Sequence, residues 1–222
     1  IRSRDLAEPA VDTRHANDER FNAIAAEWDD DPYRVLMAQK VARAMRAALS
    51  PSGQERALEF GAGTGLITLL MVPRLRRLTA MDSSTGMLAV LRQKCARKGL
   101  AQVEIVEGSV PEQLPDATFD LIYSSMTLHH IDDVPGLLRL LAAHLEVGGR
   151  VALADLDIED GGFHGGVPGI AHHGFDREVF AGWLRAAGFD EIQFSTAFTL
   201  RKARDDGGNA DYPIFLAVAR KL

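Results

Sequence analysis

Apolar residues recur along this chain in two alternating patterns. Short continuous apolar runs occur at about residues 56–60, 78–81, 103–106, 119–124 and 150–156. Between them lie segments whose apolar positions repeat every three to four residues. The short runs are typical of buried strands, and the longer repeats are typical of helices that cover them. This alternation predicts an α/β fold with a mostly parallel sheet and helices on both faces.

Two helices are predicted before the first strand. The first carries an apolar stripe at helical spacing, made of Phe21, Ile24, Ala25 and Trp28. The second is expected over residues 33–49, with an apolar face made of Met37, Val41, Met45 and Ala48. We therefore expect residues 1–50 to be an N-terminal arm and helical cap, and residues 51–222 to form the rest of the same domain.

The last part of the chain predicts one helix and two strands. Asp176 is expected to cap a helix that ends near Gly188, with an apolar side made of Val179, Phe180, Trp183 and Leu184. Strands at about 191–200 and 212–219 are joined by the turn-rich RDDGGNAD, which predicts an antiparallel pair at the sheet edge. The connection 158–175 holds six glycines and three histidines. Long irregular loops of this kind in compact domains tend to be functional.

Composition limits the class of protein. The 222 residues are 46% hydrophobic and 25% charged, with a formal net charge of −6. An acidic balance argues against a dedicated nucleic-acid binder, which needs a basic surface. The single cysteine, Cys95, rules out an internal disulfide and a multi-thiolate metal site. No apolar run is long enough to cross a bilayer. We expect a cytoplasmic protein with no nucleic-acid partner and no membrane span.

The stretch of residues 57–65, ALEFGAGTG, places three glycines directly after the first predicted strand. Glycine adopts the backbone torsions of a sharp turn, and its missing Cβ lets a ligand lie against the main chain. A strand, a glycine turn and a helix in this order predict a nucleotide-type pocket. An ordinary strand-to-helix turn is the alternative at this point.

Two acidic residues indicate which ligand such a turn would hold. Asp82 ends the second strand, 21 residues after Gly61, and can accept hydrogen bonds from a ribose diol or cap the next helix. Either a nicotinamide dinucleotide or S-adenosylmethionine would supply that ribose. The GxGxG spacing differs from the GxGxxG of dinucleotide sites, and Glu59 would repel a pyrophosphate but attract an ammonium group. The pattern favours S-adenosylmethionine.

Four motifs in order resemble those of the class I S-adenosylmethionine-dependent methyltransferases, most closely the small-molecule, ubiquinone-type branch. They are LEFGAGTG at 58–65, Asp82, FDLIYSS at 119–125 and LEVGGRVALAD at 145–155, and the resemblance covers about residues 20–220. The family implies a Rossmann-like sheet of seven strands with the last strand antiparallel. It also implies S-adenosylmethionine as cofactor and methyl transfer to a small-molecule carbon, oxygen or nitrogen nucleophile.

The resemblance also implies roles for particular residues. The methionine part of the cofactor would be surrounded by Glu59, Gly61, Ala62 and Gly63. Asp82 would hold the ribose, and Ser83 and Met87 would lie near the adenosine. The adenine would meet the loop of Gly108, Ser109 and Val110, where the family often has Gly-Asp-Ala and Ser109 would replace the acid. Ser124 and Ser125 would lie close to the sulfonium, and the motif of nucleic-acid amino-methyltransferases is absent there.

Histidines follow the fourth and fifth strands, where the acceptor is expected. Methyl transfer depends mainly on alignment, and a base is needed only if the nucleophile arrives protonated. The candidates for that base are His129, His130, His172 and His173, with pocket shaping as the alternative. The residues that could line an apolar substrate are Trp28, Phe163 and Phe175, each equally suited to packing. A metal site of His164, His172 and His173 has no acid to complete it, so we expect no metal.

Two other functions remain open from the sequence. One is a nicotinamide-dependent oxidoreductase, and the other is a methyltransferase-like protein that binds the cofactor or a partner without catalysis. The first motif and Asp82 argue against the second alternative, whereas Ser109 and the unassigned base leave it open.

Overall fold

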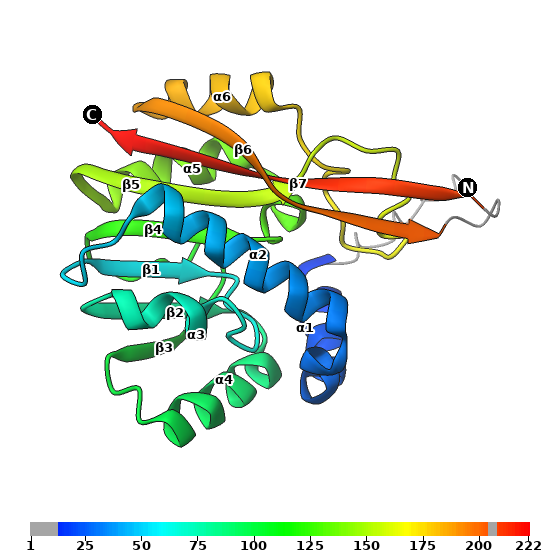
Figure 1. Ribbon diagram of the computed structural model, residues 1–222, viewed down its shortest axis with the longest axis horizontal. Helices are drawn as coiled ribbons and strands as arrows, with labels where there is room; N and C mark the ends of the chain where they lie inside the picture. The colour runs from blue at the N-terminus through cyan, green and yellow to red at the C-terminus, as the bar shows by residue number, and fades with distance from the viewer. Residues whose placement is uncertain (1–12, 204–207) are drawn as a thin grey trace, which may run out of the picture.

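The computed structural model describes residues 13–203 and 208–222. Its centre is a seven-stranded sheet in the order β3-β2-β1-β4-β5-β7-β6 (Figure 1). The strands β1 to β5 are parallel to one another, whereas β7 is antiparallel to both β5 and β6. The predicted Rossmann-like sheet with its antiparallel last strand is therefore confirmed.

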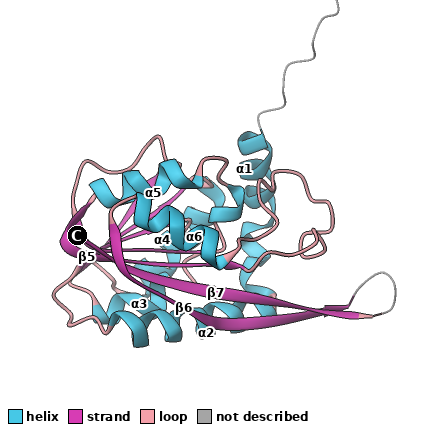
Figure 2. Ribbon diagram, turned by 90° about the horizontal axis from the view of Figure 1, so that it is seen from above, coloured by secondary structure: helices cyan, strands magenta, loops and turns pink. Residues whose placement is uncertain are grey.

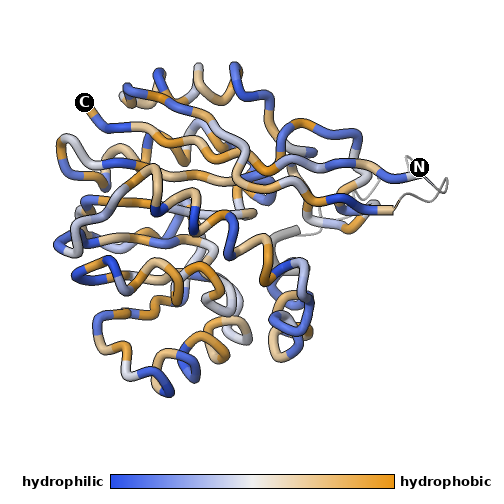
Figure 3. The backbone as a smooth tube through the Cα atoms, in the orientation of Figure 1, coloured by the Kyte–Doolittle hydropathy of each residue, from blue (hydrophilic) through white to orange (hydrophobic). Residues whose placement is uncertain are grey.

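The strands agree with the apolar runs of the sequence, and several extend further. Their bounds are β1 Arg56–Phe60, β2 Arg77–Asp82, β3 Val103–Glu107, β4 Phe119–Ser125, β5 Leu145–Leu156, β6 Phe189–Ala203 and β7 Asn209–Lys221. The extra length at the start of β5 is irregular, since its register with β4 shifts between Phe119 and Leu121. Figure 3 shows hydrophobic residues running along the central strands. Burial on both faces explains why these strands appear in the sequence as continuous apolar runs.

Six α-helices and three short 3₁₀ turns connect the strands of the described chain. The helices are α1 Thr13–Ile24, α2 Pro32–Leu49, α3 Thr68–Met71, α4 Thr85–Lys98, α5 Val134–Ala143 and α6 Arg177–Ala186. The 3₁₀ turns are η1 Ala25–Asp30, η2 Val72–Arg74 and η3 Leu128–His130. The core beside α5 and α6 is separate from the core beside α2 and α3, so the helices cover both faces (Figure 2).

Some details differ from the sequence prediction. The apolar stripe of the first helix does not belong to one continuous helix, because the backbone tightens into η1 at Ala25. Ala48 is exposed, and Leu49 takes the buried position at the end of α2. Val179 on α6 is 50% exposed, although its neighbour Phe180 is fully buried. In both helices the buried face is displaced by one residue from the predicted one, and sequence periodicity alone does not determine the face to that precision.

The helix α1 lies at the edge of the sheet where β1 ends, whereas α2 runs across one face of the sheet (Figure 1). In Figure 1 the arrowhead of β1 points toward α1. The helix α2 packs on the same sheet as the later elements through Val41 and Met45. The division of this domain near residue 50 remains a prediction. Within residues 13–203 and 208–222, no helix combines the length and apolar character that a membrane crossing requires.

Candidate active site

The glycine turn after β1 has two functionally different positions. Gly61 and Gly63 both adopt positive φ, +67° and +55°, a region that residues with a Cβ avoid. A Cβ on Gly61 would collide with the side chain of Thr127, so the missing side chain permits close packing there. A Cβ on Gly63 would meet nothing within 4 Å. Gly63 therefore presents bare backbone to an open face, as a ligand cradle requires.

Asp82 lies directly beside this turn. Its Oδ2 accepts a hydrogen bond from the Gly63 N–H at 2.8 Å, and its Oδ1 accepts one from Ser84 at 2.9 Å. Burial raises the pKa of Asp82, while these backbone hydrogen bonds act in the opposite direction. Each carboxylate oxygen can accept a further hydrogen bond. Asp82 thus both shapes the turn and can receive the hydroxyls of a sugar.

Glu59 is buried, with 3% of its surface exposed. Its Oε2 accepts hydrogen bonds from the Thr68 hydroxyl at 2.6 Å and the Tyr123 hydroxyl at 3.2 Å. Burial raises the pKa of Glu59 to about 8, and the charge of Asp82 adds to this effect. The carboxyl is therefore largely protonated at neutral pH. Its expected attraction for an ammonium group is correspondingly weakened in this arrangement.

The helix α1 lies across the turn between β2 and α4. The Ser83 hydroxyl donates to Asp18 at 2.5 Å, so Ser83 binds the helical cap. Asn22 Oδ1 accepts from the Ser84 hydroxyl and the Gly86 N–H, each at 2.8 Å. Ser84 also caps α4, because its hydroxyl accepts a hydrogen bond from the Met87 N–H. The N-terminal helix is thus fastened to the segment that would hold the adenosine.

A second set of contacts joins η1 to the glycine turn. Asp29 accepts a hydrogen bond from the Thr64 hydroxyl at 2.5 Å and forms an ion pair with Lys94 of α4. Lys94 also donates to the Thr64 carbonyl at 2.8 Å. Trp28, just before Asp29, stacks with Arg34, whose guanidinium carbon lies 3.9 Å from the ring centroid. The cap, the turn and α4 are therefore one connected unit.

The loop after β3 contributes mainly backbone. Gly108 N–H donates to the Asp82 carbonyl at 3.0 Å, and Ser109 N–H donates to Gln113 at 2.9 Å. The side chains of Val110 and Met87 are buried, with 7% and 2% exposed. Ser109 is therefore held next to Asp82, because the preceding residue Gly108 is hydrogen-bonded to Asp82. The side chains of Val110 and Met87 are packed in the interior.

The serines that end β4 are placed differently from each other. Ser124 is buried, and its hydroxyl donates to the Phe60 carbonyl at 2.8 Å, joining β4 to the start of the glycine turn. Ser125 is partly exposed, and its carbonyl accepts from the Thr127 hydroxyl at 3.2 Å. Ser124 therefore supports the glycine turn. Of these two serines, only Ser125 has a hydroxyl that makes no hydrogen bond to another described residue.

The most organised chemistry at this edge is a buried histidine and carboxylate pair. His129 Nδ1 lies 2.8 Å from Asp155 Oδ1, and the His129 N–H donates to Asp155 Oδ2 at 3.3 Å. Asp155 also accepts from the Leu156 N–H at 2.8 Å. Burial alone would raise the pKa of Asp155, but His129 and these hydrogen bonds outweigh it and hold the pKa below its usual value. Asp155 stays ionised and fixes the His129 ring.

Two further histidines pack against this pair. The rings of His130 and His164 lie 4.2 Å and 4.7 Å from the His129 ring, centroid to centroid. Burial, followed by the charge of His129, lowers the pKa of His130 to about 4 and that of His164 to about 3. Both are neutral at pH 7. His130 Nδ1 is committed to the Gly169 carbonyl at 2.8 Å, whereas His164 Nδ1 is buried without a hydrogen-bond partner.

The remaining histidine candidates are less well placed. His172 Nε2 pairs with the Ile131 carbonyl at 2.9 Å. His173 is 57% exposed and lies 3.6 Å from Glu159. Neither forms a buried carboxylate pair like that of His129. In the part of the chain that the structure describes, no three histidine, cysteine or acidic side chains are grouped to hold a metal ion.

The aromatic candidates divide in the same way. Phe175 is 4% exposed and packs on Phe180 and Phe215 in the core, which favours the packing alternative for this residue. Phe163 is partly exposed and meets the His164 ring at 4.7 Å. Trp28 meets Phe21, whose ring lies 5.7 Å from that of His130. Phe163 and Phe21 therefore flank the histidines from opposite segments of the chain.

Comparison with known proteins finds a family that is similar to part of this arrangement. Residues 58–153 match the model of the methyltransferase domain family, and this segment contains the glycine turn, Asp82 and His129. Over this segment the chain is similar to the class I methyltransferases. The cofactor of this class is S-adenosylmethionine.

The proteins similar to this chain differ in length and in name. A ubiquinone biosynthesis O-methyltransferase of Xanthomonas axonopodis is 29% identical over 190 residues, which is 77% of this chain and 78% of that protein. A demethylmenaquinone methyltransferase of Tropheryma whipplei is 30% identical over 138 residues, or 61% and 56% of the two chains. A 23S rRNA (uracil(1939)-C(5))-methyltransferase of Chromohalobacter salexigens is 30% identical over 140 residues, or 53% and 30%. This chain thus spans about half or less of the last two.

Solved structures share the fold of this methyltransferase. The DhpI-SAM-HEP complex superimposes with a TM-score of 0.72 at 19% identity, covering 97% of this chain and all of that one. YcgJ from Bacillus superimposes with a TM-score of 0.69 at 18% identity, covering 82% and 97%. Coverage of nearly the whole chain by DhpI includes the N-terminal helices in the shared fold.

Some residues of the methyltransferase site were not identified from the sequence. Asp155 lies at the end of the fifth strand, as Asp82 does at the end of the second. An acid at the end of a buried strand could therefore have indicated Asp155 as a site residue. Arg20 and Phe21 lie on the polar side and the apolar stripe of α1, and nothing local links them to histidines more than a hundred residues away. His164 was considered only as a metal ligand.

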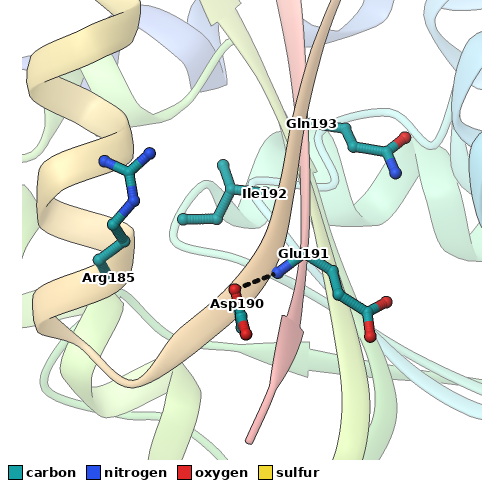
Figure 4. Close-up of a pocket in the computed structure, with 5 residues that line it drawn as sticks. All are labelled: Arg185, Asp190, Glu191, Ile192 and Gln193. Atoms are coloured by element: carbon teal, nitrogen blue, oxygen red, sulfur yellow. Dashed lines mark hydrogen bonds between the residues drawn. The ribbon is translucent and has the colours of Figure 1, made fainter.

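A surface hollow lies elsewhere on the protein. It has a volume of about 420 Å³ and is lined by Arg185, Asp190, Glu191, Ile192 and Gln193 (Figure 4). Arg185 is in the last turn of α6 and the other four residues are at the start of β6, the end of the sheet opposite to the carboxyl ends of β1 and β4. The hollow contains no part of the glycine turn or the histidine group.

Proposed function

We propose that this protein transfers the methyl group of S-adenosylmethionine to a small-molecule acceptor. One observation carries the proposal: a bare glycine turn beside Asp82 and a buried His129–Asp155 pair lie at the same edge of one sheet. The first feature suits a nucleoside-containing methyl donor. The second suits an acceptor that must lose a proton.

The residues present fit the cofactor. Gly63 has an open face, and Asp82 retains acceptor capacity toward a ribose diol. Gly61 and Ala62 would place backbone along the methionine part, Ser109 would lie toward the adenine, and Glu59 would lie behind the turn. When bound, S-adenosylmethionine supplies an electrophilic methyl carbon on a positively charged sulfur. The protein's own contribution is to hold the acceptor in line with that carbon.

The acceptor side supplies a base. The form of His129 that can act as a base is the neutral imidazole, which has its lone pair on Nε2 when its Nδ1–H is donated to Asp155. This nitrogen would accept the proton that the acceptor loses on methylation. The resulting imidazolium is stabilised by the ionised Asp155, as in other buried histidine and carboxylate pairs. His129 is thus the catalytic base of the proposal, and Asp155 is a positioning residue.

The names of the relatives inform the acceptor class. The quinone-pathway methyltransferases act on small molecules by their names, and the acidic net charge of −6 fits such an acceptor better than a nucleic acid. The rRNA methyltransferase among the relatives makes RNA the competing acceptor. A cytoplasmic location is part of this proposal. The family match disfavours the nicotinamide alternative, and a cofactor-binding protein without catalysis is the alternative that activity must exclude.

Calorimetric titration of the full chain with S-adenosylhomocysteine tests the cofactor half. We expect binding by the wild type and a loss of about tenfold or more in affinity for Asp82→Ala. Asp190→Ala, an exposed acid at the other end of the sheet, is the matched control and should bind like the wild type. Absence of binding by the wild type would overturn the proposal.

Incubation with methyl-labelled S-adenosylmethionine and fractionated metabolites tests the acceptor half. Label should enter a small-molecule fraction with the wild type and not with Asp82→Ala. Labelling of RNA alone would replace the small-molecule acceptor with a nucleic acid. Cofactor binding without label in any fraction would favour the non-catalytic alternative.

A further inference from the structure

Arg20 of α1 is a partly buried cation whose hydrogen bonds are incomplete. Its Nε is buried and has no hydrogen-bond partner. Its Nη2 donates to Asn17 at a long 3.4 Å, and its guanidinium carbon lies 4.7 Å from the Phe21 ring centroid. No ion pair joins Arg20 to a carboxylate among the residues that the structure describes. Burial without a counter-charge lowers its pKa.

A buried donor without a partner is costly, and a native site usually provides one. The cost is larger for a charged group. Arg20 could extend into solvent from its helix, yet it is held over Phe21 at the edge of the histidine group. Phe21 in turn meets His130 at 5.7 Å between ring centroids. The position of Arg20 therefore indicates a missing anionic partner on the acceptor side.

His164 is a second group of the same kind. Its Nδ1 is buried and unpartnered, and its ring lies 4.7 Å from His129 and 6.3 Å from His130, centroid to centroid. It is carried by the loop 158–175, whereas Arg20 is carried by α1. Asn17 of α1 donates to the Gly169 carbonyl of that loop at 2.9 Å. The two unpartnered groups are thus brought to the same side by a direct contact between their segments.

The charges around these groups favour an anion. Lys202 donates to the Phe163 carbonyl at 2.6 Å and its charge acts on His164, so it adds positive potential. Two acids on this side also have contacts of their own. Asp155 is held by His129, and Glu159 Oε2 accepts from the Phe163 N–H at 3.0 Å, while Glu159 Oε1 is buried beside His173 without a hydrogen-bond partner. Arg20 and Lys202 are thus two cations available to an anion here.

We propose that the methyl acceptor carries an anionic oxygen group, a carboxylate or a phosphoryl group, which Arg20 binds with His164 as a second donor. This inference rests on the proposed function and narrows its acceptor class. Arg20 Nε–H and a terminal N–H present the fork that such groups accept. Binding there leaves the rest of the acceptor next to His129 Nε2. Arg20 is then a specificity-determining residue, and the anion anchors the nucleophile for transfer.

Titration of the full chain, saturated with S-adenosylhomocysteine, tests this with small probes followed by NMR of the histidine rings. The probes are methylphosphonate, acetate and the neutral acetamide. At least one anion should shift the His164 and His130 resonances, and acetamide should not. The anion that binds more tightly identifies the phosphoryl or the carboxylate source.

Arg20→Gln should weaken that anion by about tenfold or more. Arg34→Gln is the matched control, because Arg34 also stacks on an aromatic ring of the N-terminal segment but lies on Trp28, and it should change affinity by less than about twofold. Equal binding of acetamide, no binding of either anion, or equal weakening by both variants would overturn the inference. Calorimetry with S-adenosylhomocysteine on the same samples separates the outcomes: retained cofactor binding with no anion effect rejects only the anion site, whereas absent cofactor binding rejects the proposed function.

Discussion

His129 Nδ1 and Asp155 Oδ1 lie 2.8 Å apart at the ends of two adjacent parallel strands, and both side chains are almost completely buried. The pair joins η3, just after β4, to the last residues of β5. A carboxylate in this position fixes both the tautomer and the direction of the imidazole. It also keeps its negative charge, because its pKa is held below the usual value.

Replacing Asp155 should therefore remove catalysis without removing the cofactor. Asp155→Asn would allow the other tautomer of His129. With an acceptor found by the labelling experiment, we expect kcat to fall by about 10²–10⁴-fold. Asp157→Asn is the matched control, since Asp157 lies two residues further and binds Arg177 through two contacts of 2.7 Å. Steady-state kinetics and cofactor titration would check both. Equal losses in the two variants would show that Asp155 acts only through stability.

The buried Glu59 should make folding stability depend on pH. Its folded pKa of about 8 lies above the ordinary 4.5, so the folded state holds a proton that the unfolded state loses. Stability from this group is present below pH 4.5 and is lost as the pH rises toward 8, with a slope of at most about 1.4 kcal/mol per pH unit. Glu59→Gln should flatten that slope. Urea unfolding at several pH values would measure it, with the exposed Glu27→Gln as control; an unchanged slope in Glu59→Gln would contradict the assignment.

The open face at Gly63 can be tested against a glycine with the same backbone. Gly63 and Gly99 have φ of +55° and +63°, and a Cβ on either meets no atom within 4 Å. Alanine at each position should cost a similar ~1–2 kcal/mol from backbone strain. Only Gly63→Ala should also weaken S-adenosylhomocysteine, because its methyl group would occupy the cradle. Thermal unfolding and calorimetry measure the two effects, and normal cofactor affinity in Gly63→Ala would place the ligand elsewhere.

Lys94 should couple the helical cap to the cofactor turn. It binds both Asp29 of η1 and the Thr64 carbonyl, and its side chain is only 11% exposed. Lys94→Met leaves Asp29 without its counter-charge, so we expect a loss of about 1–3 kcal/mol in the free energy of unfolding and weaker cofactor binding. The exposed Lys98→Met on the same helix should change neither. If both variants kept wild-type affinity, the cap would be independent of the turn.

The sequence predicted the features that depend on local chemistry. The glycine spacing and the acid that ends β2 each have a local physical cause, and the seven strands with an antiparallel last strand followed from the family resemblance. The His129–Asp155 pair could not be predicted from the sequence, because it depends on the register of two strands and on where η3 begins. Phe175 was a candidate either to line the substrate or to pack, and the sequence could not choose between these; it packs in the core beside Phe215. Arg20 was not identified from the sequence, because only the folded structure shows that its Nε is buried without a hydrogen-bond partner.

The Gly169 carbonyl accepts hydrogen bonds from both Asn17 and His130, at 2.9 and 2.8 Å. The same helix α1 holds Ser84 through Asn22 on its other side. One helix therefore closes the donor half and the acceptor half of the site together. A displacement of α1 that broke its contact with Ser84 would also break the Asn17 contact with Gly169, so the segments on the donor side and on the acceptor side would lose this helix together.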